Sequence, residues 1–285
     1  MARAVIAGIG IDYELIGPAD GHVVALTPGG RYARDTPGLR QLADNLVAGG
    51  KRVLLWDRPN CGASDICFEG SSESDMQARA LIGLIAELKL GPVALAAGSA
   101  GSRVSLIVAA KAPQAVSHLI LWWISGGPLS LAQLASYYYF ESAMAASHGG
   151  MAAVAQLGTW AQQIERNPAN RDIILAQNPE RYIDTLQRWA LAFAYSESSP
   201  VPGMTPADFS ALKIPALIFR SGNSDTSHTR RTSEWVHELL PQSTIVDPPW
   251  SDQEWNERLT ASLAQGRGLF EGWPKLAPAI LDFAS

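Results

Sequence analysis

The sequence predicts an α/β fold in which a mostly parallel sheet carries helices on both faces. Short apolar runs rich in Val, Ile and Leu alternate along the chain with longer segments of helical periodicity. Such alternation is typical of buried parallel strands that are joined by crossover helices. The length of 285 residues also suits one large domain with an inserted part, and 47% apolar against 17% charged residues argues against disorder.

Short apolar segments mark the predicted strands. We expect an antiparallel start over residues 4–15, followed by buried strands over residues 22–26, 52–57, 93–97, 116–124, 216–221 and 243–246. Their apolar residues are nearly continuous instead of alternating with polar ones. This pattern is typical of strands that are buried on both faces of a parallel sheet.

Helical periodicity occupies the segments between these strands. The predicted helices cover residues 39–48, 74–88, 102–112, 230–240 and 274–283. Gly49-Gly50 and Pro113 mark the ends of two of them, because glycine terminates helices and proline cannot continue them. The order of strands and helices is therefore that of an open sheet covered on both faces.

Residues 128–204 interrupt this order. The segment is helix-prone and aromatic, with the run Tyr137 to Phe140 and with Trp160 and Trp189, but it contains no convincing strand. We therefore expect a core of residues 1–127 and 205–285 and a helical lid of residues 128–204, inserted after a core strand. Ligands bind at the carboxyl edge of such sheets, so the aromatic side chains either form an apolar wall of a pocket or only pack the lid on the core.

Charge and cysteine content exclude several classes of protein. The net charge is -5 and no Lys/Arg run occurs, so we expect neither a nucleic-acid nor a membrane partner. No apolar stretch approaches the roughly 20 residues that span a bilayer, and the N-terminus makes a poor signal peptide. Cys61 and Cys67 are too few for a disulfide framework and too far apart for a CxxC motif, so a cytoplasmic protein without metal or cofactor is expected. A homo-oligomer remains open.

The turn Gly98-Ser99-Ala100-Gly101 is the strongest chemical signal. It lies between a predicted strand and a predicted helix, which is the context that a nucleophilic serine on a tight turn requires. The hydroxyl would project above the sheet, and the backbone N–H of Ala100 could face a developing oxyanion. The alternative is that Ser99 only caps the helix.

Two further segments carry a resemblance to a known family. Residues 23–30 end in Thr27-Pro28-Gly29-Gly30, and residues 56–65 resemble the signature D-x-x-G-x-G-x-S-D. With the serine turn, they make the chain similar to the α/β-hydrolase superfamily, in the branch of ring-cleavage carbon–carbon bond hydrolases, epoxide hydrolases and small esterases. The resemblance covers nearly the whole chain and implies an α/β-hydrolase fold with a mostly parallel central sheet and a helical lid.

The chain departs from the family pattern at two of these places. Ala97 stands where G-x-S-x-G has its first glycine, and Thr27-Pro28 replaces a His-Gly pair. Proline has no N–H, so the second oxyanion donor would be Gly29 or Gly30.

The resemblance also implies an acid and then a histidine after the serine. Residues 215–225 resemble P-x-L-x-x-x-G-x-x-D and assign Asp225 as the acid, with a loop-capping role as the alternative. The histidine is expected after the last strand, but Trp250 stands there, and an indole cannot accept a proton. We predict that His228 substitutes as the base, with a purely structural role as the alternative. His148 in the lid is a second candidate.

Other residues near the expected pocket are candidates for binding the substrate. Arg31 follows the glycine loop and could bind a carboxylate or enolate oxygen, or form a surface salt bridge. Side chains alternate along a strand, so one of Trp122 and Trp123 should face the site. We predict that this residue is Trp123. Arg103 is expected to make structural contacts, and Cys61 to be a buried filler.

These expectations lead to three hypotheses. The first is a hydrolase that acts on a small apolar or aromatic ester, or on an activated carbon–carbon bond, with Ser99 as nucleophile. The second keeps the fold but replaces hydrolysis by a lyase, isomerase or cyclase reaction that needs only oxyanion donors, because the usual histidine is missing. The third is a binding module without catalysis.

Overall fold

The computed structural model describes residues 2–265 and 268–285. Its centre is an eight-stranded sheet with the order β1-β2-β4-β3-β5-β6-β7-β8. The strands are β1 (Ala2–Ile6), β2 (Ile9–Ile16), β3 (Val23–Thr27), β4 (Arg52–Trp56), β5 (Val93–Gly98), β6 (Val116–Trp122), β7 (Ala216–Phe219) and β8 (Ser243–Val246). β2 pairs antiparallel with both β1 and β4, and the strands from β3 to β8 pair parallel with one another. The predicted fold class, a mostly parallel sheet with an antiparallel start, is confirmed.

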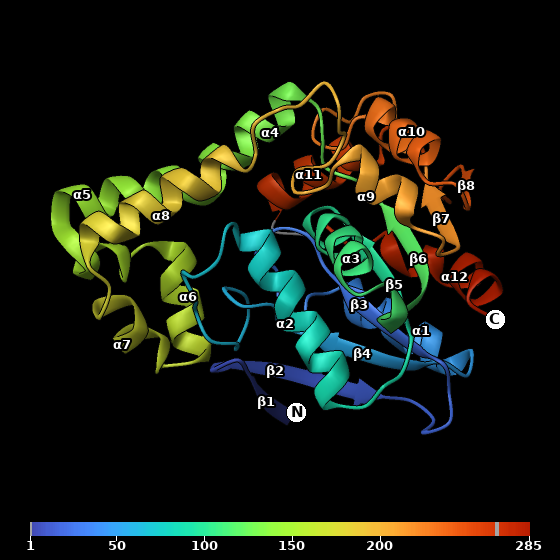
Figure 1. Ribbon diagram of the computed structural model, residues 1–285, viewed down its shortest axis with the longest axis horizontal. Helices are drawn as coiled ribbons and strands as arrows, with labels where there is room; N and C mark the ends of the chain where they lie inside the picture. Colours follow the sequence, from blue (N-terminus) through green and yellow to red (C-terminus); the bar gives the residue numbers. More distant parts are fainter. Residues whose placement is uncertain (1, 266–267) are drawn as a thin grey trace.

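Helices cover both faces of this sheet (Figure 1). One face packs against α2 (Glu73–Glu87), α3 (Ala100–Lys111), α9 (Pro206–Ala211) and α10 (Arg230–Leu239). The other packs against α1 (Leu39–Ala48), α12 (Ala277–Phe283) and the 3-10 turn Trp273–Leu276. Successive residues of β3 divide between the two cores, with Ala25 in the first and Val24 and Leu26 in the second. This is the period-two alternation of a strand buried on both faces.

A helical segment is inserted between β6 and β7. It contains α4 (Pro128–Ala135), the π-helical turn Ser136–Phe140, α5 (Glu141–Val154), α6 (Gly158–Arg166), α7 (Asn170–Leu175) and α8 (Pro179–Leu191). The long helices α5 and α8 pack side by side and extend to one side of the sheet (Figure 1). We call α4 to α8 the lid. Its aromatic residues, which include Trp160, Tyr182 and Trp189, form one hydrophobic cluster with residues 66–68 of the preceding part of the chain.

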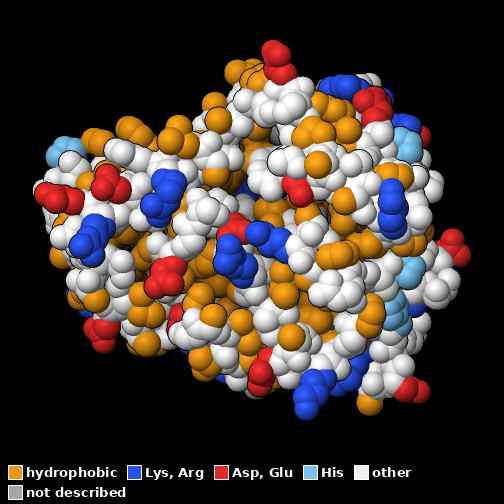
Figure 2. Space-filling view, in the orientation of Figure 1, with side chains coloured by type: hydrophobic (Ala, Val, Ile, Leu, Met, Phe, Trp, Pro, Cys, Tyr) orange, Lys and Arg blue, Asp and Glu red, His pale blue; other side chains and the backbone are white. Residues whose placement is uncertain are grey.

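The outer surface of the lid remains partly apolar. Figure 2 shows hydrophobic side chains gathered along its outer edge, over α5 and α8. Phe140 and Met144 are among its exposed apolar residues. The lid aromatics therefore divide between an internal core and solvent, and the exact division of the chain at residues 127 and 204 stays a prediction.

The structure differs from the predicted elements at several places. The predicted strand 116–124 ends at Trp122, because Trp123 has a φ of 47°, which no strand residue adopts. The antiparallel start is a hairpin, in which Ala7 and Gly8 form a two-residue turn with positive φ. The helix α11 (Glu254–Gln265) was not predicted, since it is largely polar and its Leu263 is 81% exposed, so its apolar periodicity is weak in the sequence.

Within the part of the chain that the structure describes, no helix combines the length and the apolar character needed to cross a membrane.

Candidate active site

Ser99 occupies a strained turn between β5 and α3. Its backbone has φ 57° and ψ -124°, a region that non-glycine residues avoid unless the surroundings enforce it. A Cβ on Gly98 would lie 2.3 Å from the indole nitrogen of Trp122, and one on Gly101 would lie 2.2 Å from the carbonyl oxygen of Thr27. Glycine is therefore required on both sides of this turn, as in a nucleophile elbow.

The loop after β3 lies directly against Ser99. A Cβ on Gly29 would lie 2.6 Å from the Ser99 Cβ and 3.1 Å from its Oγ. Arg58 holds this loop, because its Nη2 donates to the carbonyl oxygens of Gly29 at 3.1 Å and Gly30 at 2.6 Å. On the other side, Ala100 begins α3, where backbone N–H groups have no partner within the helix. Gly29, Gly30 and Ala100 thus place candidate oxyanion donors around one hydroxyl.

His228 lies between Ser99 and Asp225. The His228 Nε2 is 2.9 Å from Ser99 Oγ, and its Nδ1 is 3.1 Å from Asp225 Oδ2. The imidazole and the carboxylate are both buried, with 2% and 3% exposure of the residues. An ionised carboxylate can only accept, so Nδ1 carries the proton and Nε2 accepts from the serine hydroxyl. Both distances fall within the range of a working serine–histidine–acid series.

Local backbone contacts fix the position of His228. Asp225 Oδ1 accepts hydrogen bonds from the backbone N–H groups of Ser227 at 2.9 Å and His228 at 2.7 Å. Thr229, the next residue, caps the N-terminus of α10. His228 also forms an isolated parallel bridge with Gly126 in the loop after β6. Asp225 therefore acts both as the loop cap and as the partner of the imidazole, which the sequence offered as alternatives.

Two tryptophans contact the imidazole, and a third packs behind one of them. The Trp123 ring stacks nearly parallel to the His228 ring, with centroids 5.7 Å apart, and Trp255 of α11 meets it edge-on at 4.5 Å. Trp250 lies 5.8 Å from Trp123. Trp122 faces the other way and packs on Trp273. The sequence analysis missed Trp255, because its helix was not predicted.

The other four histidines make unrelated contacts. His22, His118 and His237 bond to the hydroxyls of Ser117 or Ser243. His148 is exposed on α5, and its Nδ1 lies 2.9 Å from the carbonyl oxygen of Met144 on its own helix. Of the five histidines in the chain, His228 alone is hydrogen-bonded to Ser99.

Arg31 forms a buried ion pair with Glu73. Its Nη1 and Nη2 lie 2.5 Å and 3.3 Å from the two carboxylate oxygens of Glu73, and its guanidinium stacks 4.8 Å from the centre of the Trp160 ring. Burial lowers the pKa of Arg31, but the charge of Glu73, its hydrogen bond to Arg31 and smaller contributions from other neighbours together outweigh burial, and the pKa is raised overall. The Tyr139 hydroxyl donates to Glu73 at 3.2 Å. Arg31 and Glu73 therefore connect the core to the lid.

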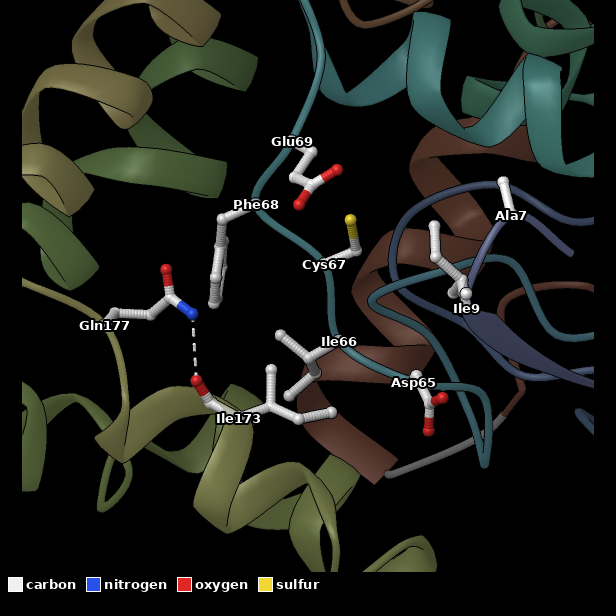
Figure 3. A pocket seen from close by; sticks show the side chains of 10 residues that line it. Ala7, Ile9, Asp65, Ile66, Cys67, Phe68, Glu69, Ile173 and Gln177 are labelled. Atoms are coloured by element: carbon white, nitrogen blue, oxygen red, sulfur yellow. Dashed lines mark hydrogen bonds between the residues drawn. The ribbon is translucent and has the colours of Figure 1, made fainter. Parts of the chain in front are cut away.

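A separate hollow lies between the β1–β2 turn and the lid. Figure 3 shows Ala7 and Ile9 on one side, the Cys67 thiol in the middle and Gln177 on the other side. None of Ser99, Asp225 and His228 lines it. Burial raises the pKa of the Cys67 thiol, so this cysteine is no ready nucleophile. Among the described residues, no group of three His, Cys, Asp or Glu could hold a metal ion.

Comparison with known proteins gives a partial sequence match. No protein-family model matches the chain. A 2-hydroxy-6-oxononadienedioate/2-hydroxy-6-oxononatrienedioate hydrolase of Escherichia coli is 32% identical over 121 residues. These residues make up 42% of this chain and 42% of the relative. The chain therefore matches less than half the length of this curated relative.

Solved structures match over nearly the whole chain. The enol-lactonase from Burkholderia xenovorans has a TM-score of 0.61 at 18% identity and covers 99% of both chains. A thermophilic esterase from Thermogutta terrifontis has a TM-score of 0.59 at 21% identity, over 93% of this chain and 97% of its own. At these identities the likeness concerns the fold alone. With its reversed β2, its helices on both faces and its lid after β6, the chain has the α/β-hydrolase fold.

Proposed function

We propose that this chain is a serine hydrolase that cleaves a small ester or an activated carbon–carbon bond beside a carbonyl group. The observation that carries the proposal is the continuous hydrogen-bonded series from Ser99 through His228 to Asp225. A serine hydroxyl is a weak nucleophile until a neighbouring base removes its proton. His228 supplies that base from the loop after β7.

The reaction begins when Ser99 Oγ attacks the substrate carbonyl carbon. His228 Nε2 takes the hydroxyl proton, and Asp225 stabilises the imidazolium that forms. The carbonyl oxygen becomes an oxyanion, which the N–H of Ala100 and an N–H of Gly29 or Gly30 would bind. The carbonyl–leaving-group bond then breaks, and the imidazolium returns its proton to the leaving alkoxide or carbanion.

Water completes the cycle. His228 deprotonates a water molecule, which attacks the acyl carbon on Ser99, and the serine oxygen leaves as the hydroxyl. An ester and an activated carbon–carbon bond share this route, because each places a leaving group on a carbonyl carbon. The names of the relatives, a hydroxy-oxo-dienedioate hydrolase, an enol-lactonase and an esterase, fall within this range.

The lyase, isomerase or cyclase hypothesis depended on the lack of a base for Ser99. A histidine nitrogen 2.9 Å from the hydroxyl removes that reason. A binding module without catalysis would not need a hydrogen bond between Ser99 and His228. The geometry therefore favours hydrolysis over both alternatives.

A fluorophosphonate probe and a chromogenic acetate ester test the proposal. We expect covalent labelling of Ser99, identified by peptide mass, and ester turnover that falls by about a million-fold in Ser99→Ala. Ser105→Ala is the matched control, since Ser105 is a buried serine of α3 whose hydroxyl has no partner among the described residues. The Ser105→Ala variant should be labelled by the probe and should turn over the ester like the wild type. An unlabelled wild type, or unchanged turnover in Ser99→Ala, would contradict the proposal.

A further inference from the structure

A second buried serine lies beside Ser99. Ser125, in the loop after β6, is 1% exposed, and its Oγ lies 3.4 Å from the Oγ of Ser99. Among the described residues, this is the one hydrogen-bond contact of the Ser125 hydroxyl. Buried polar groups in proteins are nearly always hydrogen-bonded, so the partner of Ser125 is the proposed nucleophile itself.

Two backbone contacts hold the loop of Ser125 against the site. The backbone N–H of Ser99 donates to the carbonyl oxygen of Trp122 at 3.2 Å, three residues before Ser125. Gly126, the residue after Ser125, forms a parallel bridge with His228. Because these contacts lie on both sides of Ser125, its backbone is fixed relative to Ser99 and His228, the two residues that exchange a proton in the proposed reaction.

The direction of the contact between the two serines follows from their protons. Ser99 has one hydroxyl proton, which it donates to His228 Nε2 at 2.9 Å, because the ring proton lies on Nδ1 and faces Asp225. The lone pairs of Ser99 Oγ remain available as acceptors. The Ser125 hydroxyl is therefore the donor, and its acceptor is the oxygen that attacks the substrate.

We propose that Ser125 is a further catalytic residue, whose hydroxyl stabilises the negative charge that develops on Ser99 Oγ as its proton leaves. This inference rests on the proposed function, because it requires Ser99 as the nucleophile. When His228 takes the proton, charge grows on Ser99 Oγ before the bond to the carbonyl carbon is complete. Ser125 keeps its own proton throughout and contributes a hydrogen bond alone.

The length of the contact suits a role in the transition state. A neutral O–H···O hydrogen bond is usually about 2.7–2.8 Å long, so 3.4 Å marks a weak bond in the resting site. Hydrogen bonds to a charged oxygen shorten to about 2.5–2.7 Å and are roughly twice as strong. Catalytic hydrogen bonds are often long before substrate binds and tighten in the reacting complex. A bond that strengthens as the charge develops lowers the barrier, because it favours the transition state over the ground state.

The same donor acts in both halves of the cycle. In deacylation the Ser99 oxygen leaves the acyl carbon and carries negative charge until His228 returns its proton. The oxyanion donors bind the carbonyl oxygen of the substrate, whereas Ser125 binds the oxygen of the nucleophile. The two kinds of donor therefore stabilise different atoms of the same transition state.

Ser125→Ala tests this role with a chromogenic acetate ester. We expect kcat to fall by about tenfold to a hundredfold, the usual effect of losing a hydrogen bond to a charged group. KM should stay within about threefold of the wild-type value, because the bond gains its strength in the transition state. A wild-type kcat in Ser125→Ala, or a raised KM with kcat unchanged, would overturn the inference.

Two further variants separate catalysis from packing. Ser221→Ala is the matched control and should keep the wild-type kcat. Ser221 is also 1% exposed, follows β7 at the same edge of the sheet, and has an Oγ without a partner among the described residues. Ser125→Cys keeps the shape of the side chain but has only a weak donor, so its kcat should also fall. If Ser125→Cys has the wild-type kcat while Ser125→Ala is slow, Ser125 fills space and is no donor.

The outcomes separate this inference from the proposed function. If Ser99→Ala loses turnover but Ser125→Ala equals the wild type, the hydrolase proposal stands and the role of Ser125 fails. If Ser99→Ala keeps full turnover, Ser99 is not the nucleophile, and both proposals fail.

Discussion

The loops after β7 and β8 differ in what they bring to Ser99. The loop after β7 carries Asp225 and His228, three residues apart, and both belong to the hydrogen-bonded series. The loop after β8 carries Trp250, which contacts Trp123, and leads into α11, whose Trp255 lies against the imidazole. In the family that the sequence resembles, the histidine is expected in the second loop.

This difference teaches that acid and base can form one local unit. Asp225 holds the backbone of His228 with one carboxylate oxygen and its ring with the other. The imidazole is then oriented without any group from the loop after β8. The tryptophans take up the space behind it and shield it from water, which strengthens its polar contacts.

The largest effect is expected from removing the base in the β7 loop. His228→Ala should lower kcat/KM for a chromogenic acetate ester by roughly ten thousand-fold to a million-fold, because Ser99 loses the base that removes its proton. His237→Ala is the control, since His237 bonds to Ser243 far along the chain from the elbow. A loss in His228→Ala no greater than in His237→Ala would show that the β7 loop does not carry the base.

The next effect concerns the acid of the same loop. Asp225→Asn should lower kcat by about a thousand-fold to ten thousand-fold, because an amide no longer fixes the tautomer of His228 or stabilises the imidazolium. Asp247→Asn at the end of β8 is the matched control, since its carboxylate pairs with Arg220 at the surface. The measurement is kcat from steady-state kinetics of both variants. Equal kcat values for Asp225→Asn and Asp247→Asn would contradict the assignment of Asp225.

A relocation experiment tests whether the β8 loop can replace the β7 loop. Trp250→His combined with His228→Ala should stay within about tenfold of His228→Ala alone. The reason is that the Trp250 ring packs on Trp123, and it is Trp123 that stacks on His228. The carboxylate of Asp225 is also held by the backbone of its own loop. Restoration of activity toward the wild-type rate would show that the usual family position is still competent.

The smallest effect is expected from the indole ring that α11 supplies. Trp255→Phe keeps an aromatic ring against His228 but removes an indole N–H that is buried without a partner. Aromatic contacts of this kind contribute about 0.5–1.5 kcal/mol, so kcat should change by no more than about tenfold. Trp255→Ala should have a larger effect than Trp255→Phe. If the two variants have equal kcat values, the ring does not help to position the imidazole.

Most of the fold was predictable because each signal was local. The buried strands from β3 to β8 are short runs of apolar residues, and the turn around Ser99 has its glycines in sequence. Trp123 is an exception, since nothing in the local sequence indicates its positive φ. The helix α11 was not predicted for a different reason, because it is largely polar and its apolar periodicity is weak.

The candidate site was predictable only in part. Asp225 and His228 are only three residues apart, so the sequence was enough to predict that they lie together. Arg31 was expected as a substrate ligand or in a surface salt bridge, but it lies in a buried pair with Glu73, which is 42 residues away.

A double-mutant cycle tests most directly whether Ser99 and His228 act as one unit. The measurement is kcat/KM for one ester in the wild type, Ser99→Ala, His228→Ala and the double variant. Members of a catalytic unit are grossly non-additive, so we predict that the double variant is no slower than the slower single variant. A fold loss of kcat/KM in the double variant that equals the product of the two single losses would contradict the account.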